Sequence, residues 1–163
     1  MNLIRDIAAY LAETGQSAPF NRTGYTRRQL GNLGIVGQNI YLSKFPDYDG
    51  APDGMIALFE YAGRPLDALD SAFAGLSLQV VTRDPDYVSG LTRAQTVSAM
   101  LRVIGDTDNG IPPLSINGAT YYRFAALQSP FKLKEDDRGR LYFVQNFRVW
   151  ARDNRHCKVK MKK

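Results

Sequence analysis

The fold is decided by residues 76–104, which read LSLQVVTRDPDYVSGLTRAQTVSAMLRVI. Residues 76–82 alternate between apolar and polar side chains, and this period of two predicts a strand with one buried face. Asp84 and Pro85 then supply a helix cap and a first helical residue, and apolar side chains follow at helical spacing. The direct passage from strand to helix predicts that a long helix, over about residues 85–104, packs on the sheet.

The rest of the chain supplies the other elements of an α+β domain. Apolar residues at helical spacing behind Asn2 predict an N-terminal helix that ends near residue 11. Further strands are predicted at residues 39–42, 55–61, 121–128 and 141–151. Because the order is helix, strands, helix, strands, we expect an α+β fold with a mainly antiparallel sheet of about four to six strands. A single domain is expected over residues 1–151, with an irregular loop at 16–38 and a basic, flexible tail at 152–163.

Charge is distributed unevenly along the chain. The net charge is +5, but residues 138–163 carry nine Lys or Arg against one acid, whereas residues 1–137 carry twelve bases and fifteen acids. We therefore expect a mildly acidic folded body and a basic tail. A solvated tail without a partner fits this pattern, and so does a tail that contacts phosphates or an acidic protein surface. The residues for such a contact are Arg152, Arg155, Lys158, Lys160, Lys162 and Lys163.

Composition argues against several classes of function. The 163 residues include one histidine, His156, and one cysteine, Cys157, too few for a disulfide framework, a zinc site or a histidine-based triad. These two residues are neighbours in the basic tail and cannot easily converge on one substrate atom. No stretch approaches the roughly 20 apolar residues that span a bilayer. We expect no cofactor, no metal, no membrane contact and no enzymatic activity.

Five blocks of the sequence carry a family likeness. They are residues 2–11 (NLIRDIAAYL), 37–46 (GQNIYLSKFP), 56–65 (IALFEYAGRP), 78–87 (LQVVTRDPDY), and 127–131 (LQSPF) together with 146–150 (NFRVW). In this order they resemble the minor capsid and tail-terminator proteins of tailed bacteriophages, and they cover most of residues 1–13 and 37–151. Two features depart from the family's pattern: segment 15–36 is longer than the usual link, and the basic tail extends past its end.

The resemblance implies a structural role without catalysis. Proteins of this family are small α+β subunits that form a ring, typically a hexamer, which caps the tail tube and meets the head connector. The implied partners are other copies of this chain, the tail tube protein and the connector or adaptor proteins of the head, with passing contact to DNA. The implied location is the head–tail neck of a virion that is assembled in the host cytoplasm. A head-completion, connector or minor capsid role is the alternative within the family.

Candidate interface residues are aromatic, arginine and proline residues in loops and at one strand end, because aromatic and arginine side chains anchor protein interfaces. They are Tyr25, Arg27, Arg28, Phe45, Pro46, Phe131 and Trp150. The other possibility is that the aromatic rings fold back onto their own core. A lumen through which DNA slides would favour acidic side chains, since like charges avoid the phosphate attraction. The candidates for that lumen are Asp47, Asp49, Asp53, Asp136 and Asp137.

A nucleic-acid-binding module is the competing interpretation. It rests on the basic tail and on an aromatic content of nine Tyr and eight Phe. Against it, Arg123 and Arg148 are isolated in the sequence, and no strand shows a clear platform of basic and aromatic residues.

Overall fold

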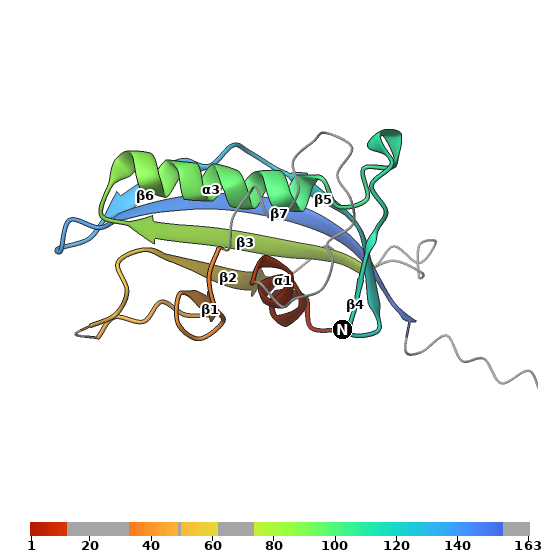
Figure 1. Cartoon of the computed structure of the whole chain (residues 1–163), viewed down its shortest axis with the longest axis horizontal. Helices are drawn as coiled ribbons and strands as arrows, with labels where there is room; N and C mark the ends of the chain where they lie inside the picture. Colours follow the sequence, from red (N-terminus) through yellow and green to blue (C-terminus); the bar gives the residue numbers. More distant parts are fainter. Residues whose placement is uncertain (13–32, 49, 62–73, 155–163) are drawn as a thin grey trace, which may run out of the picture.

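A computed structural model of the chain describes residues 1–12, 33–48, 50–61 and 74–154 (Figure 1). The elements are α1 (Leu3–Leu11), β1 (Ile40–Leu42), β2 (Met55–Tyr61), β3 (Ala74–Asp84), α3 (Tyr87–Arg102), the 3-10 helix η1 (Thr107–Asn109), β4 (Leu114–Ile116), β5 (Ala119–Ala126), β6 (Phe131–Glu135) and β7 (Leu141–Asp153). The fold is therefore α+β, as predicted. Most of the predicted loop 16–38 and residues 155–163 of the predicted tail lie outside the described ranges. Strand β7 continues two residues into the stretch that was expected to be tail.

The strands form one seven-stranded mixed sheet in the order β1-β2-β3-β7-β5-β4, and β6 also pairs with β7. Strand β1 runs parallel to β2, whereas the other pairs are antiparallel. The predicted mainly antiparallel sheet of four to six strands is therefore wrong. Two parallel neighbours need a connection that runs from the end of the first strand back to the level where that strand began. Residues 43–54 are long enough for this, but local sequence patterns do not reveal the direction in which the next strand starts. The short strands β4 and β6 were also not predicted.

Both helices pack on one face of the sheet and close the main core with it. Helix α1 contacts β1, β2 and β3, and α3 lies along the long strands β3 and β7 (Figure 1). Ile7, Val97 and Phe147 are fully buried between these layers. Within the described ranges, no helix combines the length and the apolar character needed to cross a bilayer.

Helix α3 is capped by Asp86, not by the predicted Asp84. The Asp86 carboxylate accepts a hydrogen bond of 2.7 Å from the backbone amide of Ser89. Asp84 cannot serve as the cap because it is the last residue of β3, where its backbone pairs with β7. Its carboxylate instead forms an ion pair with Arg93, one turn inside the helix, at 3.0 Å.

A buried carboxylate joins α1 to the β4–β5 hairpin. Asp6 is 2% exposed and accepts hydrogen bonds from the Tyr121 hydroxyl and, at 2.8 Å, from the Asn117 side-chain amide. Burial, and then the contact with Asp6, raises the pKa of Tyr121. The hydroxyl therefore stays protonated and remains a donor to the carboxylate. Satisfied in this way, Asp6 is tolerated inside an otherwise apolar helix face.

The opposite face of the sheet, called here the back face, is covered in part by the described residues 43–48 and 50–54 of the loop that spans 43–54. Phe45 lies on Phe59 and Tyr142, with ring centroids 5.6 and 5.3 Å away. These rings close a small apolar cluster with Val81 and Val144. The start of β7 is thus buried on both faces, with its second face covered by a loop of the same chain.

Candidate functional site

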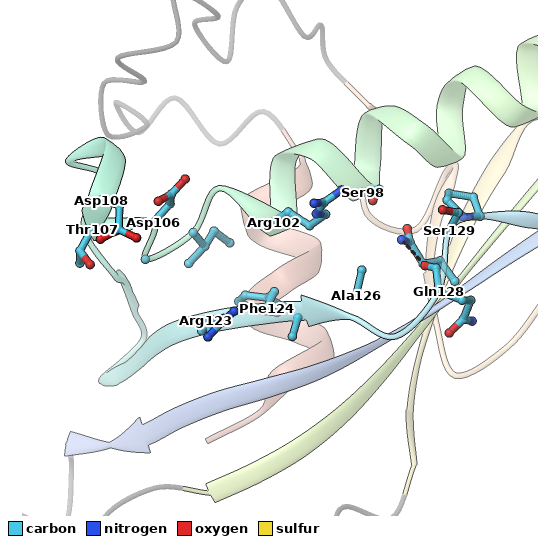
Figure 2. A pocket seen from close by; sticks show the side chains of 15 residues that line it. Ser98, Arg102, Asp106, Thr107, Asp108, Arg123, Phe124, Ala126, Gln128 and Ser129 are labelled. Atoms are coloured by element: carbon cyan, nitrogen blue, oxygen red, sulfur yellow. Dashed lines mark hydrogen bonds between the residues drawn. The ribbon is translucent and has the colours of Figure 1, made fainter.

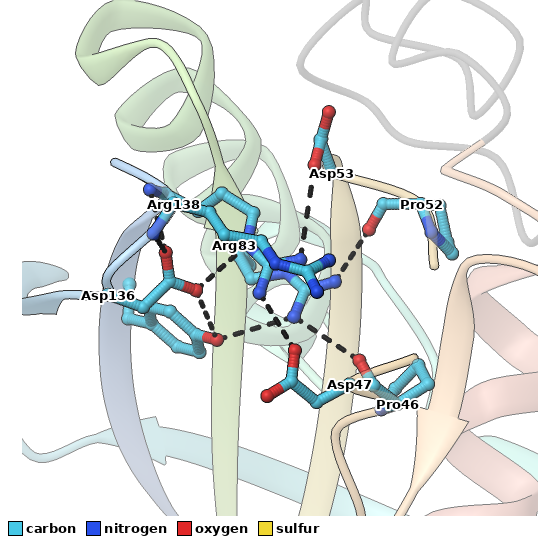
Figure 3. Close-up of polar contacts among 9 residues, drawn as sticks. Pro46, Asp47, Pro52, Asp53, Arg83, Asp136 and Arg138 are labelled. Carbon is cyan, nitrogen blue, oxygen red and sulfur yellow. Dashed lines mark hydrogen bonds and ion pairs between the residues drawn. The ribbon is translucent and has the colours of Figure 1, made fainter. Parts of the chain in front are cut away.

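Two buried arginines hold residues 43–54 against the back face (Figure 3). Arg83, on β3, is fully buried and donates to the backbone carbonyls of Pro46 and Pro52 at 3.3 and 2.7 Å. It also donates to the Tyr142 hydroxyl at 3.3 Å. Hydrogen bonds from a charged donor are stronger than neutral ones, so these contacts fix the path of the loop.

Arg140, which is 3% exposed, collects three carboxylates (Figure 3). Its Nε lies 2.8 Å from Asp136, one Nη lies 3.0 Å from Asp47, and the other Nη lies 4.0 Å from Asp53. Burial alone lowers the pKa of Arg140, but the hydrogen bonds to Asp47 and Asp136 raise it above its ordinary value. We call this set the arginine cluster. Its members are Arg83, Arg140, Asp47, Asp53, Asp136 and Tyr142.

Asp136 is the most enclosed acid of the arginine cluster. Its carboxylate accepts from the backbone amides of Arg138 and Arg140, at 3.1 and 3.0 Å, and from the Tyr142 hydroxyl at 3.1 Å. Burial alone raises the pKa of Asp136, but the hydrogen bonds from Arg140, Tyr142 and Arg138 outweigh it and lower this pKa to about 2. The charged form is therefore the one that the fold stabilises.

We expect the free energy of unfolding to fall as the pH drops from about 4 to about 2. The pKa of Asp136 is about 2 in the folded chain and near 3.8 without these contacts, so its stabilisation is complete above the higher value and is lost towards the lower one. The loss amounts to about 2 kcal/mol. Urea unfolding across this pH range measures it. Asp136→Asn should flatten the dependence of the unfolding free energy on pH. Asp137→Asn, at an exposed neighbouring residue, should leave that dependence as it is in the wild type. Equally steep dependence in the wild type and both variants would contradict the role of Asp136.

A polar cavity of about 710 Å³ opens beside β5 (Figure 2). The end of α3, the loop around η1, β5 and residues 128–130 surround it. Buried Gln145 contributes to it and donates to the Gln128 carbonyl at 2.9 Å. Arg102 and Asp108 bring charges of both signs, while Asp106 is occupied by hydrogen bonds to Asn109. The described residues hold no group of three or more His, Cys, Asp or Glu that could bind a metal ion.

Strand β6 is an exposed edge strand. All five of its residues are exposed, with Phe131 and Leu133 showing 47% and 55% of their surface. Leu127, which follows β5 and precedes β6, shows 54%. Strand β7 pairs with one side of β6, and no strand of the described ranges pairs with the other. A register shift between Lys132 and Lys134 forms a bulge, and bulges and lysines on an edge strand oppose its pairing with another strand. We call Leu127, Phe131 and Leu133 the β6 edge.

The predicted interface residues lie in different surroundings. Phe45 is half-buried and Pro46 is buried, and both pack on the chain's own sheet. Phe131 is exposed on β6, and Trp150 is half-buried on β7. Their interface roles stay predictions. Outside the described residues lie Tyr25, Arg27, Arg28, Asp49, Arg155, Lys158, Lys160, Lys162 and Lys163.

The predicted lumen acids are largely brought together by the arginine cluster. Asp47, Asp53 and Asp136 all face Arg140, although Asp47 and Asp53 keep 71% and 63% of their side-chain surface exposed. Asp137 is exposed in the turn before β7. No local pattern predicts this grouping, because Arg140 lies 93 residues from Asp47 along the chain.

The structure also brings together two arginines that are isolated in the sequence. Arg123 pairs with Trp150 across β5 and β7, and its guanidinium carbon lies 5.9 Å from the centroid of the indole ring. Arg148 lies two residues before Trp150 and therefore on the same face of β7. A bulge after Tyr121 turns Arg123 to the face opposite Tyr121, which simple alternation does not predict. We call Arg123, Arg148 and Trp150 the basic face.

The described surface thus has three distinct features: an exposed strand edge, a basic face and a loop held by buried charges. Arg152, the first residue of the predicted tail contact, lies on β7 opposite Thr120. No protein-family model and no curated protein matches the chain.

Proposed function

We propose that the protein is a non-enzymatic structural subunit of a tailed-bacteriophage virion, a tail terminator that forms a hexameric ring at the head–tail junction. The ring caps the tail tube and joins it to the head. The observation that carries this proposal is the β6 edge. An isolated chain gains nothing from three large apolar side chains that are exposed on β6 and just before it, whereas a neighbouring subunit buries them.

One of the sequence blocks that resemble this family overlaps the β6 edge. Residues 127–131 form one of these blocks and contain Leu127 and Phe131, two of the three residues of the β6 edge. Asp47 and Asp53 remain exposed beside Arg140, where they would present acidic surface to passing DNA. A closed ring needs a head-to-tail contact between two different surfaces of each subunit, and the β6 edge supplies one of them.

We expect wild-type protein to assemble into a ring of six, and the double variant Phe131→Ser/Leu133→Ser to stay monomeric. Both replaced residues are exposed, so the unfolding free energy of the monomer should change by no more than about 0.5 kcal/mol. Light scattering after size exclusion, over a range of protein and salt concentrations, measures the mass. Ile35→Ser is the matched control, because Ile35 is 53% exposed just before β1, and β2, β3 and β7 separate β1 from β6 in the sheet. This variant should still form rings.

The protein that the ring binds would distinguish a tail terminator from a head-completion or connector protein. Capping of isolated tail tubes by the wild type, and not by Phe131→Ser/Leu133→Ser, would support the tail terminator. Binding to a portal or adaptor ring instead of the tube would assign a head-completion or connector role. A wild-type chain that stays monomeric at every concentration and binds neither tube nor connector would rule out the proposal.

A further inference from the structure

We infer that the basic face of Arg123, Arg148 and Trp150 binds single-stranded nucleic acid. The inference does not rest on the proposed ring, because the basic face and the β6 edge occupy different parts of the sheet. Strand β6 pairs with residues 141–144 of β7, whereas the basic face lies at residues 148–150.

The surroundings of Trp150 leave room for a flat ligand. On β3 its neighbour in the sheet is Gly75, and the neighbour of Arg148 is Ser77. A Cβ built on Gly75 would meet no atom of the described chain within 4 Å. Small residues on β3 therefore leave open space beside the indole ring. Residues 43–54, which cover the back face around Phe45, lie over the other end of the same strands.

The charge of this part of the back face is positive. Arg123 is exposed, Arg148 is half-buried, and neither has a carboxylate partner within the described ranges. The nearest acids along the paired strands, Glu60 and Asp153, belong to the helix-covered face and act on Tyr121 there. Phosphate groups would supply the negative charge that this surface lacks.

The combination of ring and guanidinium favours an unpaired base over a duplex. The Arg123 guanidinium lies over the Trp150 ring at a cation–π distance of 5.9 Å. A base can stack on the outer side of that guanidinium or on the open flank of the indole, while Arg148 reaches the phosphate that follows. In a duplex the bases are already stacked on one another, so the indole ring would have no comparable contact to offer. The chain also continues past β7 with five Lys or Arg between residues 155 and 163, which add phosphate attraction in the same region of the sequence.

Trp150 is the only tryptophan of the chain, so its fluorescence reports on the basic face alone. We expect a single-stranded DNA of about 20 nucleotides and mixed sequence to quench this fluorescence on binding. Arg123→Gln/Arg148→Gln in the full chain should weaken binding about tenfold. Because each lost phosphate contact lowers the slope of log affinity against log salt by about 0.7, and Arg148 makes the phosphate contact, the double variant should lose about 0.7 of that slope.

Three control variants test whether the basic face, and not another charged part of the chain, is responsible for nucleic-acid binding. Arg102→Gln removes an exposed arginine on α3 and should leave binding unchanged. Lys158→Gln/Lys160→Gln/Lys162→Gln removes charge from the basic tail and should weaken binding while the quenching at saturation persists. Arg123→Lys keeps the charge and loses the planar group, so it should keep the salt slope and reduce the affinity.

Several results would overturn the inference. One is a DNA that binds the protein at low salt without quenching the fluorescence of Trp150. Another is affinity that falls only in the tail variant and stays unchanged in Arg123→Gln/Arg148→Gln. Equal affinity for a duplex of the same length would remove the role of stacking, and equal affinity for poly-glutamate would identify an acidic protein surface as the ligand. Far-ultraviolet circular dichroism of each variant ensures that a lost signal is not lost folding.

Discussion

Gly105→Ala is expected to destabilise the protein by about 3 kcal/mol. Gly105 follows α3 with φ of +71°, a left-handed conformation that costs an L-residue energy. A Cβ at this position would also overlap with the backbone carbonyl oxygen of Tyr122 on β5. Because a backbone atom cannot turn aside as a flexible side chain can, the loop after α3 would have to move away from β5. The hydrogen bond from the Gly105 amide to the Pro112 carbonyl would be disturbed with it.

Gly139→Ala is the matched control for this prediction. Gly139 has nearly the same conformation, with φ of +73°, but a Cβ there would meet nothing within 4 Å. It should therefore cost only the conformational penalty, about 1 kcal/mol. Urea unfolding of both variants measures the difference. Equal losses of stability would mean that the close approach of Gly105 to β5 is unimportant.

Arg140→Gln is expected to cost about 3 kcal/mol of unfolding free energy. The change leaves the enclosed Asp136 carboxylate without its charged partner and releases Asp47 and Asp53 from the loop. Breaking one side of a buried ion pair is costly because the remaining charge stays desolvated. Residues 43–54 should loosen first, and backbone amides there, including that of Ala51, should exchange hydrogen faster than amides of β3.

Arg102→Gln provides the comparison, since it removes an exposed arginine and should change stability by no more than about 0.5 kcal/mol. The pH dependence separates an ionic cause from a packing cause. As Asp136 becomes protonated near pH 2, Arg140 loses part of its role, and the gap between Arg140→Gln and wild type should narrow. A gap of constant size from about pH 7 to about pH 2 would indicate lost packing instead.

Elements with a strong local pattern were predictable from the sequence. The strand predicted at 55–61 coincides with β2, and the one at 76–82 lies inside β3, because continuous apolar runs and period-two alternation are properties of neighbouring residues. Strand direction is not such a property: the strand predicted at 39–42 is present as β1, but its parallel pairing with β2 was not predicted. Gly90 shows the same limit: helix propensity alone makes it a weak point, yet a Cβ there would lie 2.6 Å from the Phe143 ring. The close packing of α3 on β7 explains that glycine.

The candidate sites were harder to predict from the sequence than the strands and helices, because each site combines residues that are far apart in the chain. Asp47 and Asp136 looked like two independent surface acids, and only the fold places Arg140 between them. Arg123 looked isolated because a bulge in β5 decides which face it occupies. Phe131 was predicted as an interface aromatic residue in a loop, but the strand that contains it was not predicted, although residues 131–134 alternate between apolar and charged side chains.

The place of β7 in the sheet also bears on how the chain is made on the ribosome. Strand β7 is the last described strand in the chain, yet it lies in the middle of the sheet and pairs with β3, β5 and β6. Residue 153 is added 69 residues after residue 84, where β3 ends. At a synthesis rate of about 5 to 20 residues per second, roughly 3 to 14 s pass between the completion of β3 and the completion of β7. Throughout that interval the edge of β3 that later pairs with β7 stays open, since β2 occupies only the other edge. We therefore expect folding to be completed only after β7 has left the ribosome.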